Sequence, residues 1–242
     1  MHRRTSTAVI GVALAASVAL AANAAIASAA TRSARQLVLD AIAASKTVSS
    51  VHVVGSISST SQTIGLDVQA SNADEGKGMI SLDGGTVKVV RLGKLVYFNA
   101  NAAFWTQSAG ASSVAFAGRW VSVPASGSDG KDFAQFVGTA ALFSQILTGS
   151  RINEATFTLL KNTTVGGIPV YAIAGTDTSG GSKGTIYIAR RGKPYIVELD
   201  TTSSAGTGEL SFTAYNRPVH AAVPPHAVTL QKLEESAAAQ AG

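Results

Sequence analysis

The chain has 242 residues, of which 46% are hydrophobic and only 14% are charged, with no cysteine and a formal net charge of +5 at pH 7. This composition excludes a largely disordered chain and a disulfide framework. The basic surplus is small, and its densest cluster is the short run at 190–193, so the sequence does not indicate a nucleic-acid-binding protein.

The first thirty residues have the pattern of an export signal. A short basic start at 2–4 precedes an apolar run at 8–22, and residues 27–29 match the small-x-small pattern after which signal peptidase cuts. The apolar run is short and rich in alanine for a membrane span, although an uncleaved signal that anchors the protein is the alternative. We therefore expect a signal peptide at 1–29 and a secreted or cell-envelope protein.

The chain from residue 32 onward predicts one helix followed by a series of strands. Apolar residues at helical spacing over 32–46 indicate an amphipathic helix. The apolar period then changes to two, and five alternating segments between 51 and 99 are separated by tight turns. These segments predict an antiparallel meander with one apolar face and one polar face.

The second part of the chain begins with an aromatic-rich loop at 100–117 and a short strand at 118–124 that ends in proline. Apolar spacing then predicts a single helix from Ser128 or Asp129 to about Leu147. Four or five further strands are expected between 155 and 214, followed by an extended segment. We predict one α+β domain over 30–233 and a flexible C-terminal tail over 234–242.

Motifs that carry enzymatic chemistry are missing from the sequence. The three histidines after the signal, His52, His220 and His226, have no acidic or histidine partner at metal-ligand spacing. No Gly-x-Ser-x-Gly elbow occurs. Residues 175–180 begin like a phosphate-binding loop, but Gly181 stands where the lysine is required. We therefore expect no enzyme, no catalytic residue, no metal and no cofactor.

Both tryptophans and most of the phenylalanines lie between residues 100 and 144. One interpretation is an ordinary core beneath the predicted helix. The other is that sheet, helix and aromatic loop enclose an incompletely filled space, which would suit a carrier or sensor of an amphipathic lipid. An envelope protein-binding or regulatory module with a filled groove is the alternative function. In the carrier interpretation the apolar cavity is lined by Leu66, Val68, Ile80, Leu82, Val89, Val96, Phe98, Phe104, Trp105, Phe133, Phe136, Val137, Phe143 and Leu147.

Several strand-and-turn segments resemble the LolA/LolB-like superfamily of lipoprotein carriers, in particular the actinobacterial LppX/LprG-type lipid-binding lipoproteins. The segments that carry this resemblance are 50–57, 89–98, 118–124, 184–189, 193–199 and 212–219. The resemblance implies a strongly curved antiparallel half-barrel sheet of about ten strands, with helices covering its concave face and acyl chains held in the hollow. It also implies transient contact with a membrane surface or envelope proteins. The chain departs from the family because it has no lipidation cysteine.

Overall fold

The computed structural model describes residues 32–148, 155–177 and 181–241. The chain divides into two units, Met1–Ser33 and Ala34–Gly242, and the description below concerns the second unit. The predicted signal peptide lies outside the described residues. Within the described ranges, none of the helices combines the length and apolar character that crossing a membrane requires.

The second unit contains helices and strands throughout its length, and it belongs to the predicted α+β class. In chain order its elements are α1 (Ala34–Lys46), β1 (Ser50–Ser59), β2 (Thr63–Ser71), β3 (Glu75–Leu82), β4 (Gly85–Leu92), β5 (Leu95–Ala100), α2 (Ala102–Ala109), the 3-10 helix η1 (Ala111–Phe116), β6 (Trp120–Pro124), α3 (Ser128–Ala134), α4 (Thr139–Thr148), β7 (Ala155–Leu159), β8 (Thr163–Val165), β9 (Ile168–Asp177), β10 (Lys183–Ala189), β11 (Ile196–Ser203), β12 (Gly206–Thr213), β13 (Val228–Thr229) and α5 (Leu230–Ala241).

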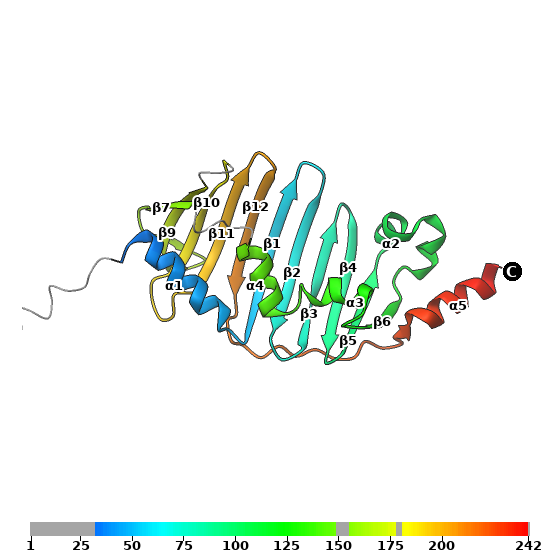
Figure 1. Ribbon diagram of the computed structural model, residues 1–242. Helices are drawn as coiled ribbons and strands as arrows, with labels where there is room; N and C mark the ends of the chain where they lie inside the picture. Colours follow the sequence, from blue (N-terminus) through cyan, green and yellow to red (C-terminus); the bar gives the residue numbers. More distant parts are fainter. Residues whose placement is uncertain (1–31, 149–154, 178–180, 242) are drawn as a thin grey trace, which may run out of the picture. The chain divides into compact units, whose positions relative to one another are not determined.

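The strands form one open, strongly curved sheet with helices across its concave face, which confirms the predicted fold class (Figure 1). The strand order is β13-β6-β5-β4-β3-β2-β1-β12-β11-β10-β9-β7, and β8 pairs with β9. All described neighbours are antiparallel except β13 and β6, which are parallel. The thirteen strands in the described part of the chain exceed the expected ten partly because β8 and β13 are too short to show an alternating pattern.

Apolar side chains form two rows across the concave face, each interrupted by one glycine, because residues that pair in register on antiparallel strands project to the same side. Helix α4 packs on the second row where Phe143 stacks on Phe212, and α3 packs on it where Phe133 stacks on Phe98. The first row consists of Leu159, Ile173, Ile186, Leu199, Leu210, Gly55, Leu66, Ile80, Val87 and Ala100. The second consists of Phe212, Val53, Val68, Gly78, Val89, Phe98 and Val121.

The single helix predicted from 128 to about 147 is wrong, because α3 and α4 are separated by a break at 135–138. At this break the Val137 carbonyl oxygen accepts a hydrogen bond from the Ser71 backbone N–H (3.1 Å), and Gly138 forms a bridge with Ser71. The backbone of the break therefore pairs with the end of β2 instead of continuing a helix.

The remaining differences concern segments that were expected to lack regular structure. The aromatic loop folds into α2 and η1, and the Asn101 side chain caps α2 by accepting a hydrogen bond from the Phe104 backbone N–H (2.9 Å). The segment predicted as a tail continues helix α5 as far as Ala241.

Candidate functional site

The predicted lining residues occupy three kinds of position in the structure. Leu82, Phe104, Phe133 and Phe136 are partly exposed. Leu147 belongs to α4, but its side chain lies outside the described part of the structure. The others are buried in the hydrophobic core between sheet and helices: Leu66, Val68, Ile80, Val89, Val96, Phe98, Trp105, Val137 and Phe143.

A third row on the concave face, nearer the β1–β2 and β3–β4 hairpins, remains accessible. It consists of Ile57, Ile64 and Leu82, which are opposite one another on β1, β2 and β3; we call it the hairpin strip. Ile57 is 42% exposed, and Ile64 and Leu82 are partly exposed. Alternation placed Ile57 and Ile64 on the apolar side of their strands, but neither was among the predicted lining residues. The concave face thus carries an accessible apolar strip beside its buried core.

A cluster of aromatic rings continues the hairpin strip towards β5. Gly85 on β4 pairs with Leu82, and a Cβ atom at Gly85 would lie only 3.0 Å from the Phe104 Cα atom. Helix α2 therefore begins directly over the end of the strip. The rings that we call the aromatic cluster have centroids 5.0–6.3 Å apart in their contacting pairs, the range of favourable aromatic packing: Phe98, Phe104, Trp105, Phe116 and Phe133.

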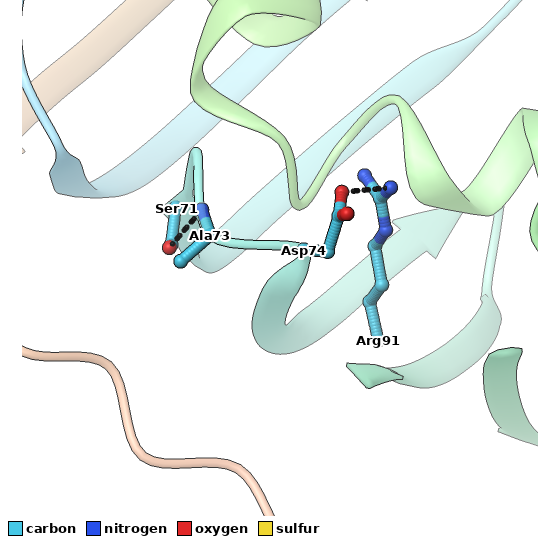
Figure 2. A network of polar contacts seen from close by, with 4 residues as sticks. All are labelled: Ser71, Ala73, Asp74 and Arg91. Carbon is cyan, nitrogen blue, oxygen red and sulfur yellow. Dashed lines mark hydrogen bonds and ion pairs between the residues drawn. The ribbon is translucent and has the colours of Figure 1, made fainter. Parts of the chain in front are cut away.

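Polar contacts order the β2–β3 turn and connect it to β4 (Figure 2). In the β2–β3 turn, the Ser71 hydroxyl oxygen accepts a hydrogen bond from the Ala73 backbone N–H (3.0 Å), and Asp74 forms an ion pair with Arg91 of β4. The Arg91 guanidinium also lies beside Gly138, where an added Cβ atom would be 3.5 Å from Nη1. Because the Asp74–Arg91 ion pair is partly solvated, it fixes the position of the β2–β3 turn more than it adds to the stability of the fold.

The convex face carries polar and charged side chains instead. His52 Nε2 lies 2.7 Å from an Asp67 carboxylate oxygen, and Asp200 and Glu209 are directly opposite each other on β11 and β12. Burial, the nearby Asp200 carboxylate and the Glu209 carboxylate raise the pKa of Glu198. Among the residues in the described ranges, no group of histidine and acidic side chains is arranged to hold a metal ion.

The raised pKa of Glu198 predicts a pH-dependent contribution to stability. A carboxyl group whose folded pKa is raised favours folding below its unfolded value and loses that contribution as the pH rises through the folded pKa. We therefore expect Glu198→Gln to raise the melting temperature at pH 7 and to change it little at pH 4, below the reference value of 4.5. Asp200→Asn should act in the same direction by removing the repulsion. If the melting temperatures of wild type and Glu198→Gln differed by the same amount at pH 4 and at pH 7, the raised pKa of Glu198 would be contradicted.

Comparisons with known proteins identify the fold. No protein-family model matches the chain, and no curated protein matches its sequence. The lipoprotein LppX from Mycobacterium tuberculosis superposes with a TM-score of 0.51 at 15% identity, covering 77% of this chain and 96% of LppX. LprF from Mycobacterium bovis superposes with a TM-score of 0.50 at 17% identity, covering 81% of this chain and 97% of LprF. The resemblance predicted from the sequence is thus confirmed as a shared fold.

Proposed function

We propose that the protein is an exported, non-enzymatic carrier or sensor that binds the acyl chain of an amphipathic lipid against the concave face of the sheet. The observation that carries this proposal is the hairpin strip. Its apolar side chains remain accessible on the face that elsewhere forms the core, and they continue into the aromatic cluster. An accessible apolar surface beside a packed core is typical of a ligand-binding or interaction site.

The extent of this surface suits an acyl chain. Strands lie about 4.8 Å apart, so the distance from Ile57 on β1 to Gly85 on β4 corresponds to roughly 14 Å. The hydrocarbon layer of one bilayer leaflet is roughly 15 Å thick, half of the whole hydrocarbon core. The surface therefore matches the length over which an acyl chain extends in one leaflet. Because each buried methylene contributes about 0.8 kcal/mol, even partial coverage of a chain gives measurable affinity. The shared fold with a lipoprotein and the sequence resemblance to lipid-binding lipoproteins support the same proposal.

The proposed site of action is outside the cytoplasm. It rests on the export-signal pattern of residues 1–29, which is followed by no cysteine for lipid attachment. In this proposal, residues 30–233 form the binding domain and act secreted or within the cell envelope. The lipid is the principal partner, and contact with a membrane surface or an envelope protein is transient.

A second candidate function is an envelope protein-binding or regulatory module. It is favoured by the buried state of most predicted lining residues, since Val68, Val89 and Val96 are almost inaccessible. In such a module the protein's own side chains fill the groove. A stable protein partner recovered from the envelope, without bound lipid, would support this second function.

The hairpin strip provides a direct test of the carrier function. Replacing Ile57 by asparagine should weaken the binding of a fluorescently labelled monoacylglycerol about tenfold, because a polar side chain removes part of the apolar contact. Val54→Asn is the matched control, since Val54 lies on the same strand, is 41% exposed and projects from the opposite face. Fluorescence titration of both variants measures the effect. Equal affinities for the two variants would exclude the strip as the binding surface.

The ligand itself is accessible to native mass spectrometry. Protein purified from its own host is expected to carry an additional mass that organic extraction removes and that lipid analysis identifies. A protein that shows only the mass of the bare chain, and that takes up no fluorescently labelled monoacylglycerol, is not a lipid carrier.

A further inference from the structure

We propose that the indole N–H of Trp105 donates a hydrogen bond to the carbonyl oxygen of an acyl ester, so that the site selects neutral acyl esters among apolar ligands. This inference rests on the function proposed above and adds the chemical class of the ligand. It starts from a polar group inside the aromatic cluster that the fold itself does not satisfy.

The unsatisfied group is the indole nitrogen. Trp105 is 7% exposed, its Nε1 atom is inaccessible to solvent, and it forms no hydrogen bond with any described residue. An indole N–H can only donate, and a buried donor without an acceptor is costly. An acceptor supplied by a ligand would remove that cost.

The surroundings of Trp105 explain why the protein leaves this donor unpaired. The backbone N–H of Trp105 donates to the Asn101 carbonyl oxygen (3.3 Å), and its own carbonyl oxygen accepts from the Ser113 hydroxyl (2.8 Å). Its ring neighbours are Phe98, Phe104 and Phe116. These phenylalanine rings have no conventional acceptor for the indole N–H. The backbone N–H and carbonyl groups of Trp105 therefore have hydrogen-bond partners, whereas its indole N–H has none among the described residues.

The place of Trp105 relative to the hairpin strip indicates which part of a lipid would reach it. Phe104, the preceding residue, lies over Gly85 at the end of the strip. An acyl chain lying along Ile57, Ile64 and Leu82 would therefore reach the aromatic cluster with one end, and in this proposal that end is its carbonyl end. The rings of the cluster carry no charge to pair with a carboxylate, and burial of an unpaired carboxylate is strongly unfavourable. The chemistry of the cluster therefore favours a neutral ester.

The experiment compares an ester with its ether analogue, which has the same chain but lacks the carbonyl oxygen. Monooleoylglycerol and its oleyl ether analogue each displace the neutral dye N-phenylnaphthylamine from the full-length protein. Wild type should bind the ester about three- to tenfold more tightly, as expected for one added hydrogen bond. Trp105→Phe should remove this preference by weakening ester binding alone. Trp120→Phe is the matched control. Trp120 lies on β6 and projects from the face opposite to its neighbour Val121, so this variant should retain the preference for the ester.

A spectroscopic signature provides a second measurement that does not depend on the folding of the Trp105→Phe variant. In Trp120→Phe protein, Trp105 is the single tryptophan, and its indole N–H resonance should move downfield with the ester but not with the ether. Equal affinities for the two lipids in wild type, or equal resonance shifts, would overturn the hydrogen bond while leaving the carrier function intact. Failure of both lipids to displace the dye would instead overturn the carrier function.

Discussion

Replacing Phe143 by alanine is expected to lower the free energy of unfolding by about 3–5 kcal/mol, the usual cost of removing a buried phenylalanine side chain. Phe143 is 2% exposed, and its ring stacks on that of Phe212 with a centroid distance of 5.9 Å. This contact fastens α4 of the helical layer to β12 of the sheet, so the truncation would leave a cavity at their junction. Chemical denaturation followed by circular dichroism measures the loss.

Phe136→Ala is the matched control for this truncation. Phe136 lies in the α3–α4 connection and is partly exposed, so the same substitution should cost much less stability. Phe143 was predicted from the sequence to line a ligand cavity, and the structure places it in the core. If Phe143→Ala kept its stability and lost lipid binding, the sequence-based prediction would be right and its assignment to the packed core would be wrong.

The strands could be predicted from the sequence because a half-buried strand alternates apolar and polar residues. The five alternating segments predicted between 51 and 99 correspond to the strands β1 to β5. The break between α3 and α4 was not predictable in this way. Apolar spacing fits one helix or two, and the outcome depends on a backbone hydrogen bond from Ser71, more than sixty residues away in sequence.

The candidate site was only partly predictable for a related reason. Alternation along β1 places Val53 and Ile57 on the same face, yet Val53 is fully buried and Ile57 is 42% exposed. Which side chains remain accessible depends on how the helices pack across the sheet, and this information is absent from the periodicity of a strand. The predicted lining residues consequently included many that form the core. The unpaired indole of Trp105 also results from tertiary packing, because its ring neighbours come from β5, α2 and η1.

The two halves of the sheet meet at β1, which pairs with β2 on one side and with β12 on the other. Gly55 lies at the middle of this strand with φ +152°, a conformation that side chains with a Cβ atom rarely adopt. A Cβ atom there would overlap the Glu209 carbonyl oxygen of β12 and lie 2.9 Å from the Leu210 Cα atom. Alanine must therefore strain the backbone of β1 or push β12 away.

Replacing Gly55 by alanine is accordingly expected to cost about 2–6 kcal/mol of unfolding free energy, the sum of backbone strain and overpacking. Amide hydrogen exchange should increase first in β1 and β12, because their pairing is disturbed directly. Gly65→Ala on β2 is the matched control, since a Cβ atom there would meet only the Ser81 side chain, which can rotate away. If both variants were equally stable, close approach at Gly55 would not determine how β1 and β12 join. If Gly55→Ala lost more lipid binding than its unfolded fraction explains, the hairpin strip would depend on this joint for its shape.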